Sequence, residues 1–244
     1  MNKILTGALL LLFSSSAAAQ TPRDSIAFAT AQWRTADLGG GAECRYAQID
    51  MFGSRQSISV ATYPGRRFTT SIVHLDRRAE STSDLGKAAG AEIAVNGSYF
   101  NVKTFEPVTF VLLDRKIVGR TTPEEAFRTN GVIAFKDRKG RRMEIFPCDT
   151  TQYADVARYR SALAAGPVLI DGGKVVEYTS GSSFYTRRHP RTLIGKRADG
   201  TVVMAVIDGR FKGQGDGATI AETAYIARQL GLTEALNLDG GGSS

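Results

Sequence analysis

The sequence predicts an α+β fold: a single domain with a mixed, mostly antiparallel sheet, a few flanking helices and an active-site cleft at strand ends. Short β-rich runs bounded by Gly, Pro, Asn or Asp recur along most of the chain. Only two or three segments have the periodicity of a helix. Two apolar runs stop abruptly at an Asp-Gly, at Asp208 and at Asp239, which places polar chemistry where strands end.

Length and composition allow one substantial core. The chain has 244 residues, of which 42% are hydrophobic and 23% charged, a composition that argues against low-complexity disorder. We expect one domain over residues 20–244, because no linker and no internal repeat interrupts it.

The first residues have the pattern of a secretory signal peptide over residues 1–19. Lys3 precedes the apolar run 4–13, and small residues at Ala17 and Ala19 favour cleavage before Gln20. The run is too short to span a membrane. We therefore expect an exported protein, periplasmic or secreted, without membrane insertion after cleavage.

The charge balance favours an anionic partner. The formal net charge is +7, and loss of Lys3 with the signal peptide leaves +6. The basic residues are scattered and form no helical stripe, so we expect no nucleic acid partner. Cys44 and Cys148 are the only cysteines. In an oxidising compartment they either form one disulfide or remain two unpaired thiols.

The first half of the chain predicts an antiparallel meander followed by one helix. The expected strands lie within residues 27–33, 44–49, 57–63 and 68–75, and the helix within 83–90. The apolar run 91–95 then predicts a strand that ends in a tight turn at Asn96-Gly97.

The second half predicts more strands and a longer helix. Strands are expected at 107–113, 116–119, 131–135, 143–147, 161–170 and 174–178, with a turn at 171–173 and a short helix near 151–159. Residues 192–195 and 201–207 predict an apolar hairpin around the turn 198–200. A helix begins near Thr219, and the final apolar run is 235–238.

Several common catalytic sites are excluded by the residues available. His74 and His189 are the only histidines, which argues against a histidine-rich zinc site and against most Ser-His-Asp arrangements. No Gly-x-Ser-x-Gly elbow occurs. The glycines of 213–217 lack the βαβ context of a dinucleotide loop.

What remains is a set of carboxylates, amides and arginines near the predicted strand ends. An arginine fork can bind a phosphate through two hydrogen bonds, and N–H groups of a glycine turn or a helix start can bind its other oxygens. Hydrolysis of a glycosidic bond needs one protonated and one ionised carboxyl group. The members of this set are Asp208, Glu222, Asp239, Asn96, Asn237, Arg191 and Arg210.

Each of these residues also has a structural interpretation. Glu222 follows Thr219 by three positions, the spacing of a capping box. Asp208 and Asp239 precede glycines as turn residues do, although three glycines after Asp239 favour close approach of a ligand. Alternatively, Arg191 and Arg210 are surface charges, and Tyr99 is a core residue.

Six ordered motifs resemble the phosphodiester glycosidase family. They cover about residues 90–244, whereas residues 20–89 match weakly and are expected to be the variable N-terminal part of the same domain. The motifs are VNGSYFN (95–101), AAGPVLIDGGKV (164–175), RHPRTLIG (188–195), VIDGR (206–210), TIAE (219–222) and LGLTEALNLDGGGSS (230–244).

The resemblance implies hydrolysis of a sugar-1-phosphodiester to a free sugar and a phosphomonoester, with a phosphorylated carbohydrate as substrate. It implies catalytic roles for Asp208, Glu222 and Asp239. No cofactor or metal ion is implied, and a divalent cation between Asp208 and Asp239 is the alternative. Substrate binding is expected of Asn96, Tyr99, Arg191, Arg210, Asn237, Gly240, Gly241 and Ser243, with the phosphate on the two arginines and the backbone of 240–242.

Two other functions remain compatible with the sequence. One is hydrolysis of phosphodiester linkages within cell-wall or exopolysaccharide polymers. The other is a non-catalytic module that binds an anionic glycan. Members of the family usually continue beyond the DGGGS motif, whereas this sequence stops at Ser244. Either the sequence is a fragment or the last strands are missing, in which case the final strand is expected at a sheet edge without its partner.

Overall fold

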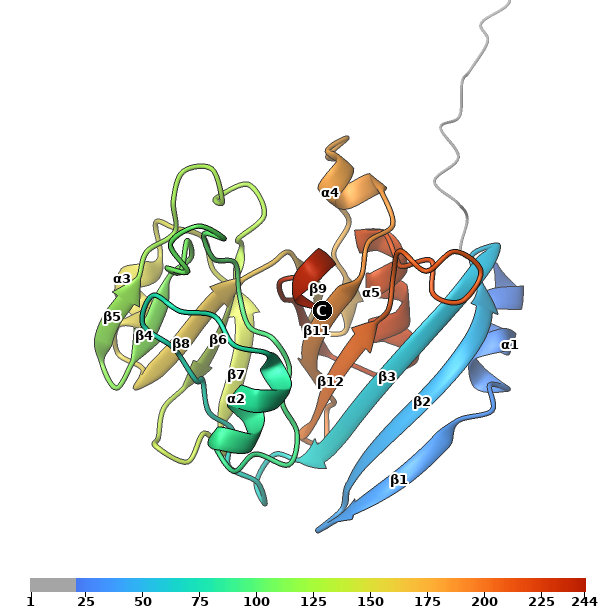
Figure 1. The fold of residues 1–244 in the computed structure, drawn as a ribbon, viewed down its shortest axis with the longest axis horizontal. Coiled ribbons are helices and arrows are strands. Elements are labelled where there is room, and N and C mark those ends of the chain that lie inside the picture. Colours follow the sequence, from blue (N-terminus) through green and yellow to red (C-terminus); the bar gives the residue numbers. More distant parts are fainter. Residues whose placement is uncertain (1–20) are drawn as a thin grey trace, which may run out of the picture.

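The computed structural model describes residues 21–244, so the expected signal peptide lies outside the described residues. The domain consists of two packed antiparallel sheets with helices on the outer faces (Figure 1). All strand pairs of the described chain are antiparallel, so the mostly antiparallel prediction is confirmed, but there are two sheets instead of one mixed sheet.

The larger sheet has eight strands in the order β1-β2-β3-β12-β11-β13-β9-β10. Along its strands, successive side chains point alternately into two different apolar cores, one on each face of the sheet. The strands are β1 (Arg34–Gly39), β2 (Ala42–Met51), β3 (Ser54–Pro64), β9 (Val168–Asp171), β10 (Lys174–Val175), β11 (Arg191–Lys196), β12 (Thr201–Ile207) and β13 (Glu234–Asn237).

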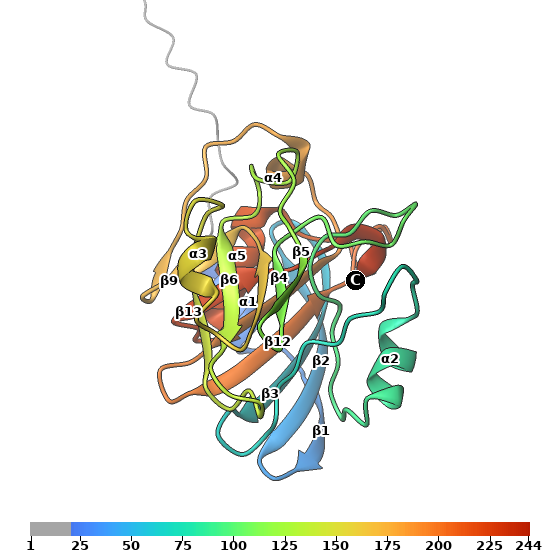
Figure 2. The same cartoon turned by 90° about the vertical axis from the view of Figure 1, so that its left-hand side faces the viewer.

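The smaller sheet has five strands in the order β5-β4-β8-β6-β7. It packs face to face on the larger sheet through a shared apolar core (Figure 2). Its strands are β4 (Val111–Leu113), β5 (Lys116–Gly119), β6 (Gly131–Phe135), β7 (Met143–Pro147) and β8 (Ser161–Ala165).

Helices cover the remaining faces. On the far side of the larger sheet, α5 packs apolar side chains such as Ile226 and α1 packs Phe28. The outer face of the smaller sheet is covered by α3, and α2 lies at the front between the sheets (Figure 1). The helices are α1 (Pro22–Ala29), α2 (Thr82–Ala88), α3 (Tyr153–Val156), α4 (Ser183–Thr186), α5 (Ile220–Gln229) and the 3-10 turn η1 (Gly241–Ser243). None of the helices in residues 21–244 has the length and apolar character needed to cross a membrane.

Three predicted strands are wrong, and the strand predicted at 161–170 is divided into β8 and β9, which lie in different sheets. Residues 27–33 begin as the end of α1, because Thr21 and Asp24 form a capping box and Pro22 occupies the first turn. Residues 68–75 and 91–95 are irregular segments that flank α2. Asn96-Gly97 is not a hairpin turn, since the Asn96 side chain binds a distant loop instead.

The two cysteines are both unpaired. Cys44 lies on β2 of the larger sheet, and Cys148 follows β7 of the smaller sheet, where it is buried. The disulfide alternative is therefore wrong for this structure.

Candidate active site

The ends of β12 and β13 meet at one edge of the larger sheet. β11 lies between them and runs antiparallel to both, with Arg191 opposite Ile207 and Leu193 opposite Asn237. Asp208 and Asp239 therefore leave the sheet on the same side, two strand spacings or about 10 Å apart along the edge. The two strand ends predicted to carry polar chemistry thus lie at one edge, and the cleft expected there stays a prediction.

The third segment joins this edge through Asn96. Its amide Nδ2 donates to the Asp239 carbonyl oxygen at 2.8 Å, and the Asp239 N–H donates to the Gly97 carbonyl at 2.9 Å. Thr192 of β11 donates to the Asn96 Oδ1 at 2.6 Å. Asn96 thus orients the loop that carries Asp239, and its own polar atoms are engaged by the protein.

The Asp239 carboxylate is held by its own loop. Ser243 Oγ donates to Oδ2 at 2.7 Å, and the Gly240 N–H donates to Oδ1 at 2.8 Å. Burial raises the pKa of Asp239, and this exceeds the opposing effect of the two hydrogen bonds and of the Arg128 charge. A carboxyl group that keeps its proton above the usual range is suited to general acid catalysis.

Each of the three glycines after Asp239 has a different environment. A Cβ on Gly240 would lie 2.6 Å from the Pro190 carbonyl oxygen, so the backbones approach too closely for a side chain. Gly241 has a φ of +68°, and a Cβ there would lie 3.0 Å from Arg210 Nη2. Gly242 faces open space. The loop is therefore closely packed at Gly240 and Gly241, and it has free space beside Gly242.

Arg210 and Arg191 have different environments. Arg210 is exposed and lies against the Gly241 backbone, where it can bind an anion. Arg191 is 2% exposed, and its Nε and Nη2 donate to the carbonyls of Ala218, Phe184 and Arg187. Burial lowers the pKa of Arg191 to about 10. Arg191 thus connects the loops around the site.

Tyr99 and Asn237 lie beneath the carboxylate. The Tyr99 hydroxyl and the Asn237 Nδ2 both donate to the Gly166 carbonyl. Burial raises the pKa of Tyr99, so the phenol stays neutral. Asn237 Oδ1 has no hydrogen-bond partner although it is buried. Both residues are almost fully buried and bind protein groups, so the core alternative describes Tyr99, and substrate contact with either residue stays a prediction.

Arg128 is a site residue that the sequence did not indicate. Its guanidinium carbon lies 4.0 Å from the centre of the Tyr99 ring. Its Nε also forms an ion pair with the Glu125 carboxylate at 2.6 Å. The pKa of Arg128 is raised: burial acts to lower it, but the hydrogen bond to Glu125 and the charges of Glu125 and Asp239 outweigh burial. Arg128 lies in the irregular segment 120–130, outside every motif, so only tertiary packing reveals it.

Glu222 lies in a capping box and an ion pair. It accepts a hydrogen bond from the Thr219 N–H at 2.9 Å, while its own N–H donates to Thr219 Oγ1 at 3.1 Å. Arg188 binds the same carboxylate with Nε and Nη2, the latter at 2.6 Å. The structural interpretation considered for Glu222 thus describes its contacts.

Asp208 has fewer contacts than Asp239. Ser57 Oγ donates to Asp208 Oδ2, and the Asp208 N–H donates to the Ser57 carbonyl. A side chain on Gly215 would lie 3.1 Å from the Asp208 Cβ, so the loop 211–215 packs closely beside it. Within residues 21–244, no three Asp, Glu, His or Cys side chains gather into a potential metal site.

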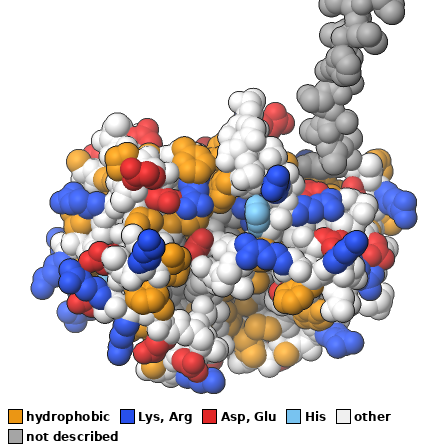
Figure 3. Space-filling model, turned by 45° about the horizontal axis from the view of Figure 1, so that its top comes forward, with side chains coloured by type: hydrophobic (Ala, Val, Ile, Leu, Met, Phe, Trp, Pro, Cys, Tyr) orange, Lys and Arg blue, Asp and Glu red, His pale blue; other side chains and the backbone are white. Residues whose placement is uncertain are grey.

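The surface above the site carries mixed charges. Figure 3 shows Lys and Arg side chains spread over this face among acidic ones, without a single basic stripe. Positive charge on this face is therefore local and forms no continuous basic track.

Comparison with known proteins gives one family. The family model for phosphodiester glycosidase matches residues 89–244. N-acetylglucosamine-1-phosphodiester alpha-N-acetylglucosaminidase of Mus musculus is 26% identical over 180 residues, which are 69% of this chain and 34% of that protein. The SPbeta prophage-derived uncharacterized protein YomE of Bacillus subtilis is 42% identical over 57 residues, 23% of this chain and 9% of that protein.

Two solved structures have the same fold. The catalytic domain of the zebrafish N-acetylglucosamine-1-phosphodiester alpha-N-acetylglucosaminidase, auto-inhibited by its pro-peptide, gives a TM-score of 0.64 at 17% identity, over 87% of this chain and 76% of that one. A hypothetical protein from Synechocystis gives 0.60 at 15% identity, over 86% and 58%. The chain spans about a third of the length of the mouse relative.

Proposed function

Because the chain belongs to the phosphodiester glycosidase family, we propose that it hydrolyses the glycosidic bond of a sugar-1-phosphodiester. The products are a free sugar and a phosphomonoester. The observation that carries this proposal is the partly buried Asp239, whose pKa is raised, beside two arginines at the strand edge. The mouse relative bears the name of such an enzyme.

In the proposed reaction, water adds to the sugar C1 as the bond from C1 to the phosphate oxygen breaks. Asp239 donates its proton to the departing oxygen, and Ser243 and the Gly240 N–H hold the resulting carboxylate. Asp208, on the other side of β11, accepts the proton of the attacking water. The proton released by water thus balances the proton given to the phosphomonoester.

The phosphate is proposed to lie between Arg210 and Arg128. Arg210 is exposed beside the loop tip, and Arg128 is close enough for its charge to act on Asp239. Arginines placed at a leaving phosphate stabilise the charge that develops on it, and one well-placed donor contributes about 3 to 4 kcal/mol. We assign Arg191 to holding the loops around the site in place, because its Nε and Nη2 already donate hydrogen bonds to three backbone carbonyl oxygens.

The proposal is tested with a panel of sugar-1-phosphodiesters. Free sugar and phosphomonoester are measured for the wild type, for Asp239→Asn and for Asp50→Asn, a control at a carboxylate whose side chain is 75% exposed. We expect release by the wild type and the control only. Absence of release from every substrate would contradict the proposal.

We also propose export to the periplasm or the medium, supported by the signal-peptide pattern of residues 1–19. N-terminal sequencing of the protein from cell fractions tests this. A mature N-terminus at Gln20 outside the cytoplasm is expected, and an intact N-terminus in the cytoplasm would contradict it.

A further inference from the structure

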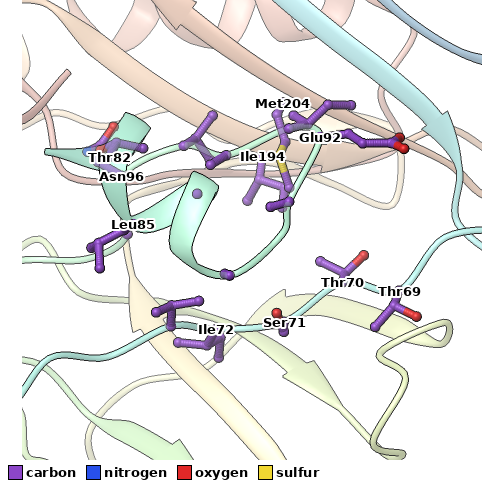
Figure 4. A pocket seen from close by; sticks show the side chains of 18 of the residues that line it. Thr69, Thr70, Ser71, Ile72, Thr82, Leu85, Glu92, Asn96, Ile194 and Met204 are labelled. Atoms are coloured by element: carbon purple, nitrogen blue, oxygen red, sulfur yellow. The ribbon is translucent and has the colours of Figure 1, made fainter. Parts of the chain in front are cut away.

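A large apolar cavity lies between the two sheets beneath α2. Its volume is about 450 Å³, and it is partly open to solvent. Ile194 of β11 and Met204 of β12 form one wall, and Leu85 of α2 lies opposite. Figure 4 shows α2 and the segment 69–72 enclosing the space on the side away from Ile194 and Met204.

The cover of this cavity has little regular structure. Residues 66–81 and 90–98, before and after α2, contribute no strand, and they supply lining residues such as Ile72 and Val95. Irregular segments with few ladder hydrogen bonds open at lower free energy than the sheets they cover. A ligand can therefore enter beneath α2 without disturbing either sheet.

The cavity directly adjoins the candidate active site. Ile194 lines the cavity, and Thr192, two residues earlier on the same face of β11, binds Asn96. Two residues along a strand span about 7 Å. Asn96, Gly97 and Leu238 line the cavity, and Asn96 and Gly97 also bind the backbone of Asp239.

The two ends of this region therefore differ in character. Arg210 and Arg128 lie at the site, where the phosphate is proposed to bind. The cavity two residues further along β11 is lined mainly by aliphatic and aromatic side chains. A molecule with a phosphodiester head and a hydrocarbon tail matches both parts.

We propose that the cavity binds the hydrocarbon chain of a lipid aglycone, so that the substrate is a sugar linked through a phosphodiester to a single alkyl, acyl or prenyl chain. This inference rests on the proposed function, because it assigns the second half of the same substrate. An apolar cavity of about 150 Å³ holds one benzene ring, so a cavity three times as large holds roughly ten to fifteen carbons.

The first test is a chain-length series. Sugar-1-phosphodiesters with methyl, hexyl and dodecyl aglycones are hydrolysed by the full chain below their micelle concentrations, and kcat/KM is measured. Each methylene buried from water favours binding by up to about fourfold. We expect an increase of about tenfold or more from methyl to dodecyl, and a plateau beyond the length that fills the cavity.

Matched variants place the effect in the cavity. Ile72→Trp adds bulk to the lining, while Ile117→Trp makes the same change on β5 at a residue that is 43% exposed. We expect Ile72→Trp to keep methyl hydrolysis but lose the gain with chain length, and Ile117→Trp to keep both. If Ile72→Trp fails to fold, Leu85→Phe on α2 makes the same test.

A binding measurement separates this inference from the proposed function. Decyl phosphate, which has no glycosidic bond, is titrated calorimetrically into the wild type and the two tryptophan variants. Binding that is lost only in Ile72→Trp supports the cavity site even if no phosphodiester is hydrolysed. Hydrolysis of the methyl substrate without chain-length dependence, or decyl phosphate binding that is absent or equal in all three proteins, overturns it.

Discussion

The two aspartates at the edge of the larger sheet follow the same local pattern but have different environments. Each follows an apolar strand and precedes a glycine. Asp239 lies in a loop that turns back on it, within reach of the Arg128 charge, and burial raises its pKa. Asp208 has one side-chain hydrogen bond, from Ser57. The comparison shows that the loops around a strand end, not the strand itself, decide what its carboxylate can do.

The largest expected effect is that of Asp239→Asn. Because the amide cannot donate the carboxyl proton, we expect kcat to fall by about 10³-fold or more. Circular dichroism and thermal unfolding check that the fold is kept. Equal losses from Asp239→Asn and Asp208→Asn would break the distinction between the two residues.

Asp208→Asn is expected to lower kcat by about 10²-fold, since activation of water is lost while proton donation remains. A pH–rate profile separates the two roles. The wild-type rate should fall as pH rises through the raised pKa of Asp239, and Asp208→Asn should keep this alkaline limb. A variant profile that is flat at high pH would assign the acid to Asp208.

Arg128→Lys tests whether the arginine near Asp239 contributes to the difference between the two aspartates. Lysine keeps the charge but not the planar group above Tyr99, so we expect kcat/KM to fall by about 10²-fold, as for loss of one preorganised donor. Arg120→Lys, at an exposed position, is the control. Unchanged kinetics in both variants would remove Arg128 from the site.

Glu222→Gln is expected to act on stability. The change removes the negative charge from the ion pair with Arg188, in which the Glu222 side chain is 9% exposed. It also alters the capping box at the start of α5. We expect the free energy of unfolding in urea to fall by about 2 to 3 kcal/mol, with kcat changed by less than about threefold.

The control for Glu222 is Glu106→Gln. Its pair with Arg77 is exposed on both sides, so the expected change in stability is within about 1 kcal/mol. Loss of turnover in Glu222→Gln at full stability would return Glu222 to a catalytic role.

The smallest effect is the pH dependence of stability at Asp239. Since its folded pKa lies above the unfolded value, the folded state binds this proton more tightly, and the resulting stability is lost as pH rises through the folded pKa. We expect the free energy of unfolding of the wild type, relative to Asp239→Asn, to decrease from pH 3 to pH 7. A relative increase would contradict the raised pKa.

The sequence predicted the hairpin of β11 and β12, the helix at Thr219 and the final strand, because each has strong local signals. It failed at residues 68–75 and 91–95, where apolar residues line a cavity without strand partners. Apolar periodicity records burial, and burial alone does not require a hydrogen-bonded ladder.

For the site, the sequence by itself determined which polar residues end the strands and where glycines allow close approach of the backbone, as at Gly240. Only the tertiary structure decided that Arg128 joins Asp239, that Arg191 binds carbonyl oxygens and that Glu222 pairs with Arg188. The physical reason is range: strand ends, caps and turns depend on neighbours a few residues away. Burial, pKa shifts and ion pairs depend on segments that only folding brings together.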